Sequence, residues 1–534
     1  MNEHRHEDLG AATTSPGADA DAALGGLPEA SDTIVRGSVL AFAAQAVGGL
    51  STGALTVFLA RRLGSAGFGV FSLALSIETL LLLVSDLGVI QALQRFVAEN
   101  RHDRSAVGAV VGDAIRLKLM SSLAGAAALA ALADVVAHAY GSPKLGLTLR
   151  GIALDLVGMN FLLMFAGVFT AMRVQAMTLT AFFLESMVEL TASVVLVLTL
   201  GGAAAAAFGR AIGYLCGAAA GLALTVRLAG PGVLARIWRP RGNMRRIAGD
   251  AGPLLIVNGA YTLFTQIDSL LIAAFLSVTS VGVWQAPLRL VVLMVYPGQA
   301  IGSAVSPRLA RSDGGVEPGS FTQAIRVVMV LMAAMTAVSV AWATPIISLT
   351  LGSAFRGSAG VLRGLGPFIF LSGLGPLVSV GMNYLGAARR RIPIAIATVL
   401  LNLIVDLILI PRIGVLGGAL GTDAALLLYV PAHFLYCQRA LNIPLTPSAK
   451  TLGRSLLAGG AMALVLAAFG TRNLSVPEVL GGAALGTSAF AAVLLISREL
   501  TLRELLLLWL WIKRRASRPS RARSHNASGS RRDR

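Results

Sequence analysis

The chain has 534 residues, of which 55% are hydrophobic and only 13% are charged. Soluble domains carry about 25% charged residues, so a water-soluble fold is excluded. The formal charge of +18 is spread over the loops between apolar segments and gathers in the C-terminal tail, which favours anionic lipid over nucleic acid as a partner.

Fourteen apolar segments follow the N-terminal tail, and each is long enough to cross about 30 Å of hydrocarbon as an α-helix. The sequence therefore predicts an all-α polytopic membrane protein with about fourteen transmembrane helices. We place them at 34–60, 69–92, 114–137, 149–171, 177–200, 203–228, 252–275, 281–304, 327–351, 361–386, 392–411, 414–437, 452–470 and 478–496.

The first twelve segments divide into two groups of six, which predicts two pseudo-symmetric lobes followed by two C-terminal helices. A weak internal repeat supports the division: VLVLTLGGAAAAAFGRAIGYL echoes LILIPRIGVLGGALGTDAALLL, with Gly209 equivalent to Gly421. Two units of the same orientation are typical of transporters with a central cavity. The expected regions are a disordered acidic tail (1–33), an N-lobe (34–230), a basic cytoplasmic linker (231–251), a C-lobe (252–440), two further spans (451–497), an interfacial helix (498–512) and a disordered basic tail (513–534).

Arginine and lysine are enriched in the loops after even-numbered segments. By the positive-inside rule these loops face the cytoplasm, and so do both termini.

Polar side chains at membrane depth are the best candidates for function, because each costs a few kcal/mol unless it is paired or hydrated. Both predicted lobes supply them: Gln45, Glu78, Asp155, Asn160, Glu185, Glu189, Arg210, Asp268, Arg289, Asn402, Asp406 and Asp423.

Two pairs within this set suggest specific chemistry. Asp268 and Arg289 lie at similar depth on either side of a short turn, so they form either an ion pair that pins two helices or an arginine offered to an anionic substrate. Glu185 and Glu189 are four residues apart on one helix face, so one of them either carries a proton or lines a hydrated cavity.

Pro287, Pro297, Pro367 and Pro376 are expected to bend their helices. We find no catalytic constellation, no phosphate-binding loop and no metal-ligand pattern, so the sequence predicts neither an enzyme nor a cofactor or metal site. Cys216 and Cys437 each lie inside an apolar segment and suggest no disulfide.

Three stretches of the sequence resemble the polysaccharide-flippase branch of the multidrug/oligosaccharidyl-lipid/polysaccharide (MOP) exporter superfamily. They are FLARRLGSAGFGVFSLALSIETLLLLVSDLGVIQALQRFVAE, QIDSLLIAAFLSVTSVGVWQAPLRL and NLIVDLILIPRIGVLGGALGTDAALLLY. Their order and spacing carry the resemblance more than any single motif does.

The resemblance implies two six-helix lobes that alternate between inward and outward openings, with an undecaprenyl-pyrophosphate oligosaccharide as cargo. Asp268 and Arg289 match the aspartate and arginine of the family's seventh-to-eighth-span hairpin. The first segment lacks the acidic residue common in multidrug members and the arginines of lipid II flippases. These departures lower the expectation of drug export and of peptidoglycan precursor as cargo.

We therefore expect a flippase in the bacterial inner membrane that supplies polysaccharide biosynthesis. Arg289 and Arg210 would bind the pyrophosphate, Gln45, Asn160 and Asn402 would bind sugars, and Asp268, Glu78, Glu185 and Glu189 would serve coupling or ion pairs. A polysaccharide polymerase and glycosyltransferases are possible protein partners. The alternatives are a cation-coupled multidrug exporter and a non-transporting membrane scaffold for polysaccharide enzymes.

Overall fold

The structure, a computed structural model, describes residues 27–86, 88–230, 232–237, 252–309, 316–472 and 474–501. The expected all-α class is confirmed, because nearly all of this part of the chain is helical. Twelve helices in the described part are long and apolar enough to cross a membrane, which makes the chain a multi-pass membrane protein.

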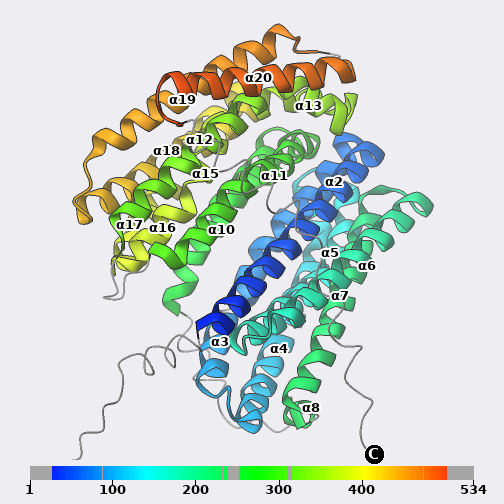
Figure 1. Cartoon of the computed structure of the whole chain (residues 1–534). Helices are drawn as coiled ribbons and strands as arrows, with labels where there is room; N and C mark the ends of the chain where they lie inside the picture. Colours follow the sequence, from blue (N-terminus) through cyan, green and yellow to red (C-terminus); the bar gives the residue numbers. More distant parts are fainter. Residues whose placement is uncertain are drawn as a thin grey trace, which may run out of the picture.

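The helices form two bundles, which Figure 1 shows in blue to teal and in green to orange. The N-bundle comprises α2 (Leu27–Asp86), α3 (Val89–Glu99), α4 (Arg104–Ala139), α5 (Pro143–Ala171), α6 (Gln175–Thr199), α7 (Gly202–Ala229) and α8 (Gly232–Ile237). The C-bundle comprises α10 (Gly252–Phe275), α11 (Val278–Leu309), α12 (Pro318–Ala341), α13 (Ala343–Thr350), α14 (Ser358–Gly364), α15 (Gly366–Ser372), α16 (Gly375–Tyr384), α17 (Arg391–Ile413) and α18 (Val415–Ala440).

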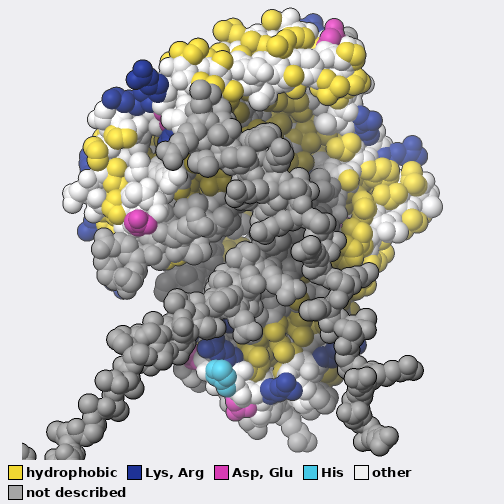
Figure 2. Space-filling model, in the orientation of Figure 1, with side chains coloured by type: hydrophobic (Ala, Val, Ile, Leu, Met, Phe, Trp, Pro, Cys, Tyr) yellow, Lys and Arg dark blue, Asp and Glu magenta, His cyan; other side chains and the backbone are white. Residues whose placement is uncertain are grey.

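Two further helices, α19 (Leu445–Ala468) and α20 (Val476–Ile496), pack on the outside of the C-bundle, where α19 contacts α12. The two bundles meet mainly where α2 lies beside α11. We call the end of the molecule with α3 and α8 the α3 end, and the opposite end the α13 end. Figure 2 shows apolar side chains over the visible faces of both bundles, as a surface in contact with lipid requires.

Every predicted span overlaps a helix, but several boundaries differ. The first two spans merge into α2, which begins at Leu27 and kinks at Gly64. Gly64 has a φ of 66°, a backbone conformation that glycine adopts without a steric penalty. The first four residues of the predicted interfacial helix, 498–501, are not helical. The rest of that helix, the basic tail, residues 1–26 and most of the linker lie outside the described residues.

The predicted span 361–386 is divided into three short helices, α14, α15 and α16. Pro367 and Pro376 lie in the first turn of α15 and α16, where the missing proline N–H costs nothing. The backbone N–H of Phe368 donates to a carboxylate oxygen of Asp423 at 2.8 Å. Asp423 therefore stabilises the start of α15, a structural role for one of the polar residues at membrane depth.

Glycines bring polar side chains of neighbouring helices into close packing in both bundles. A Cβ at Gly213 of α7 would lie 2.6 Å from the Cβ of Glu189, and one at Gly421 of α18 would lie 1.9 Å from a carboxylate oxygen of Asp406. Gly209, which the internal repeat aligns with Gly421, likewise packs on the backbone of α6 at Ser193. Only glycine allows these acidic helices to approach so closely.

Candidate functional site

A cavity of about 740 Å³ lies between the two bundles. It is lined from the N-bundle by α2, α5 and α7, and from the C-bundle by α10, α11 and α15–α18. Its volume falls within the range of small-molecule sites, roughly 300–1,000 Å³. The polar residues that line it include Ser72, Ser76, Glu78, Thr79, Arg210, Thr265, Gln266, Asp268, Gln285, Arg289, Gln299, Ser379, Arg391, Thr398, Thr422 and Tyr429.

On the α13 side of this cavity the two bundles are in backbone contact. A Cβ at Gly69 of α2 would lie 2.1 Å from the carbonyl oxygen of Val278, and one at Gly282 of α11 would lie 2.1 Å from that of Ser65. No side chain fits at either position. The glycine pair therefore permits a tight crossing of α2 and α11.

Two further contacts join the bundles at the same end. The Arg61 guanidinium donates to the carbonyl oxygens of Leu349 and Thr350, at 2.8 Å for Thr350, and so caps the end of α13. The rings of Phe68 and Phe355 meet edge to face with centroids 5.9 Å apart. Arg61 thus bridges the two halves of the molecule.

Arg289 projects from α11 into the cavity with its guanidinium carbon 5.3 Å and 5.7 Å from the ring centroids of Phe68 and Phe71. Within the described part of the chain, no carboxylate pairs with it. The hypothesis of an Asp268–Arg289 ion pair is therefore wrong, because the carboxylate of Asp268 bonds to α17 and α18 instead. Arg289 keeps a positive charge that a ligand can neutralise.

Arg210 of α7 is the other arginine predicted to bind substrate, and it is already neutralised. Its Nε lies 2.6 Å from a carboxylate oxygen of Asp155, and its Nη1 lies 3.1 Å from one of Glu189. The guanidinium carbon also lies 4.5 Å from the centre of the Tyr214 ring. Arg210 therefore lines the cavity as part of an ion cluster rather than as a free cation.

Two more carboxylates adjoin this cluster. Glu78 of α2 is buried beside Asp155, and Glu185 lies one turn from Glu189 with a hydrogen bond from Ser186 at 3.0 Å. Of the three predicted glutamates, only Glu78 lines the cavity. Burying several acids around one arginine is costly, so the cluster depends on Arg210.

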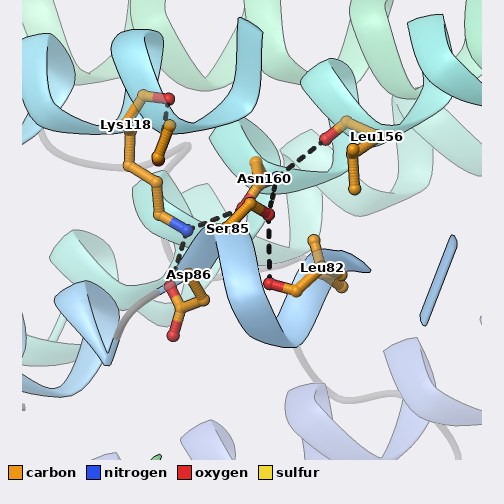
Figure 3. A network of polar contacts seen from close by, with 7 residues as sticks. Leu82, Ser85, Asp86, Lys118, Leu156 and Asn160 are labelled. Carbon is orange, nitrogen blue, oxygen red and sulfur yellow. Dashed lines mark hydrogen bonds and ion pairs between the residues drawn. The ribbon is translucent and has the colours of Figure 1, made fainter. Parts of the chain in front are cut away.

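Asn160, predicted to bind sugar, lies instead in a closed network (Figure 3). It accepts a hydrogen bond from Nζ of Lys118 at 2.7 Å and donates to Ser85 at 2.9 Å. Lys118, which is completely buried, also pairs with Asp86 at 2.6 Å. Because these groups satisfy one another away from the cavity, we withdraw Asn160 as a substrate contact.

Asn402 also lies behind the cavity wall and holds a pair of aspartates. Its Nδ2 donates to Asp268 and to Asp406, each at 3.1 Å, and Thr422 donates to the other oxygen of Asp268 at 2.8 Å. Asp268 and Thr422 reach the cavity lining, whereas Asn402 and Asp406 do not. Asn402 is therefore corrected from a sugar contact to the centre of this C-bundle cluster, formed by Asp268, Asn402, Asp406 and Thr422.

Two oxygens of the C-bundle cluster have no partner within the described part of the chain: Oδ1 of Asn402 and Oδ1 of Asp406, both buried. No basic side chain pairs with its two carboxylates there. Carboxylate, amide and hydroxyl oxygens together suit a hard cation or a shared proton. The cluster thus offers oxygen acceptors without a cation of its own among the described residues.

Gln45 is outside the residues whose side chains are described. The sequence analysis overlooked three others: Lys118, Arg391 and Tyr429. Asn402 and Asp406 could have been paired from sequence, because their i, i+4 spacing places them on one helix face.

A profile of the family described as "Polysaccharide biosynthesis protein" matches residues 34–313. Among solved structures, a lipid II flippase MurJ in an inward closed conformation is 13% identical, with a TM-score of 0.69, and the match covers 86% of this chain and 99% of that one. An inward-facing multidrug resistance MATE transporter of the MOP superfamily is 15% identical, with a TM-score of 0.61 and coverage of 74% and 96%. A MOP superfamily transporter from Pyrococcus furiosus is 16% identical, with a TM-score of 0.53 and coverage of 76% and 96%. No curated protein matches the sequence.

The resemblance to the MOP superfamily is thus confirmed, and the fold is the one that the MurJ and MATE structures share. With more than half of its length matched by the family profile, the chain belongs to the family described as "Polysaccharide biosynthesis protein".

Proposed function

We propose that the protein flips a lipid-linked oligosaccharide, with an undecaprenyl-pyrophosphate carrier, across the bacterial inner membrane. The observation that carries the proposal is Arg289, a cation without an acidic partner in the described structure, inside a cavity shared by the two bundles. Burying a charge without a partner costs free energy unless a bound ligand supplies the opposite charge. A pyrophosphate provides that partner, while the prenyl tail stays in the surrounding lipid.

The basic loops support an orientation in which the α3 end and both termini face the cytoplasm. In this orientation the cavity lies on the cytoplasmic side of the Gly69–Gly282 contact. Release to the outside then requires α2 and α11 to separate at these glycines. The proposed transport cycle is therefore a rocking motion of two rigid bundles about a central site.

Two sources of energy are consistent with the site. A membrane potential negative inside favours outward movement of an anion by about 2.3 kcal/mol per net charge per 100 mV. The C-bundle cluster could add coupling, because binding of a cation or proton would relieve the repulsion between its two aspartates. We assign this coupling role to Asp268 and Asp406.

The experiment is flipping of a fluorescent prenyl-pyrophosphate oligosaccharide by the full-length protein in proteoliposomes. Arg289→Gln should lower the rate at least tenfold, and Arg289→Lys should retain part of it, because lysine keeps the charge without the bidentate geometry. Arg412→Gln removes an exposed arginine of α17 outside the cavity and should leave the rate unchanged. Equal rates for Arg289→Gln and Arg412→Gln would contradict the proposal.

The runner-up transporter, a cation-coupled multidrug exporter, predicts drug sensitivity in a deletion strain. A scaffold for polysaccharide enzymes predicts that truncation after Ile512 abolishes polysaccharide export, whereas a flippase retains flipping without its basic tail. Anionic lipids at that tail, and a polymerase and glycosyltransferases as partners, belong to the same proposal.

A further inference from the structure

The cavity contains a second arginine without an acidic partner, at a different depth from Arg289. Arg391 is the first residue of α17, at the α3 end, and its side chain lines the cavity together with Ser379 and Tyr429. Only neutral groups accept its hydrogen bonds: Nη1 donates to Oδ1 of Asn383 at 2.9 Å, and Nη2 donates to Oη of Tyr429 at 3.2 Å.

The N–H donor on Nε of this guanidinium is unused. Nε of Arg391 is buried and has no hydrogen-bond partner within the described part of the chain. A guanidinium offers five N–H donors in a fixed plane that matches the oxygens of a phosphate or a carboxylate. An oxyanion ligand is therefore the natural partner for this side chain.

Neighbouring side chains hold the guanidinium in place. The Tyr429 hydroxyl that accepts from Arg391 is itself hydrogen-bonded to Ser379 at 3.1 Å. The Tyr429 ring packs on His433, with ring centroids 4.0 Å apart. Tyr429 is thus a positioning residue. It already restricts Arg391 to few rotamers, so the side chain loses less conformational entropy when a ligand binds.

The three arginines that line the cavity differ in how much charge they can offer. Arg210 is neutralised by two carboxylates, whereas Arg289 and Arg391 have none. Arg289 lies roughly 16 Å along α11 from the α13 end, and Arg391 lies roughly 33 Å along α17 from that end, at 1.5 Å per residue. The two arginines are therefore placed on the chain at different depths of the cavity.

We propose that Arg391, positioned by Tyr429, forms an oxyanion-binding site at the mouth of the cavity, distinct from the deeper site at Arg289. The inference rests on the proposed function and deepens it. The ligand group is a phosphate of the lipid carrier or a carboxylate of an acidic sugar. The site holds the incoming headgroup before, or while, the rest of it reaches Arg289.

The test is equilibrium binding of two probes, farnesyl diphosphate and glucuronic acid, to the purified full-length protein in detergent. Arg391→Gln should weaken binding of farnesyl diphosphate about tenfold, the usual scale for losing a charge-assisted hydrogen bond. Arg390→Gln is the matched control, because Arg390 bonds to Tyr436 outside the cavity lining, and it should change binding less than twofold. If only glucuronic acid depends on Arg391, the site is retained and its ligand is an acidic sugar.

Tyr429→Phe keeps the ring packing and removes the hydroxyl. It should therefore weaken binding of farnesyl diphosphate about threefold without lowering the thermal midpoint. Arg391→Lys should recover part of the affinity. If Arg391→Gln and Arg390→Gln bind both probes equally well while Arg289→Gln binds farnesyl diphosphate more weakly, the oxyanion-binding site at Arg391 is overturned and the flippase proposal stands. Absence of binding of both probes to the unaltered protein would overturn both.

Discussion

The two bundles bury acidic clusters of opposite character. In the N-bundle, Asp155 and Glu189 surround the guanidinium of Arg210, so the chain supplies its own cation. In the C-bundle, Asp268 and Asp406 share the amide of Asn402 and have no basic partner within the described residues. The acids of the N-bundle thus share a cation that the chain supplies, which is typical of a structural cluster. We propose that the C-bundle cluster, which has no cation of its own among the described residues, is where a cation or proton from solution acts.

The largest predicted effect follows removal of the N-bundle cation. Arg210→Met leaves Asp155 and Glu189 buried without a partner and should destabilise the fold by about 3–5 kcal/mol. The thermal midpoint in detergent measures the loss. The triple variant Arg210→Met, Asp155→Leu, Glu189→Leu should recover most of it, and failure to recover any would show that the guanidinium acts by packing rather than by charge.

The next largest loss of stability is expected for the network around Lys118 that Figure 3 shows. Lys118→Met removes the partner of Asp86 and one donor to Asn160, which should cost about 2–4 kcal/mol. Lys144→Met, at an exposed position in the first turn of α5, is the control and should leave the stability within about 0.5 kcal/mol of the parent. Equal midpoints for the two variants would contradict a stabilising role of the network.

The C-bundle should respond in the opposite direction. Asp406→Asn removes one of two neighbouring carboxylates and should raise stability by about 1 kcal/mol in cation-free buffer, because like charges in a low dielectric repel. The same variant should lose any dependence of the thermal midpoint on sodium. Asp155→Asn in the N-bundle is the matched neutralisation and should destabilise. If Asp406→Asn and Asp155→Asn shift the thermal midpoint in the same direction, the distinction between the two clusters is wrong.

The smallest effect concerns Glu499, beyond the end of α20. Burial raises the pKa of its carboxyl, but hydrogen bonds from Thr451, Arg454 and Arg326 outweigh burial and hold the pKa below the ordinary 4.5. A lowered pKa stabilises the fold above the ordinary value, and the contribution is lost as pH falls through the folded-state pKa. The thermal midpoint should therefore drop below about pH 4.5, with a smaller drop in Glu499→Gln; equal drops would contradict the assignment.

The sequence predicted helices well and side-chain partners poorly, for physical reasons. Apolar length alone defines a spanning helix, so every predicted span overlaps one. Partners depend on how helices far apart in sequence pack, and Asp268 could not be paired with Asn402 from spacing along the chain. The division of 361–386 into three helices was missed because it depends on Asp423 of another helix, which caps α15.

The measurement that tests the account most directly is the rate at which the reconstituted protein flips a prenyl-pyrophosphate oligosaccharide at a clamped membrane potential. The account predicts flipping faster than in protein-free vesicles, accelerated by a potential negative on the cytoplasmic side, and lost in Arg289→Gln. A rate equal to that of protein-free vesicles, or one indifferent to the potential and to proton and sodium gradients, would contradict driven transport of an anionic headgroup through this cavity.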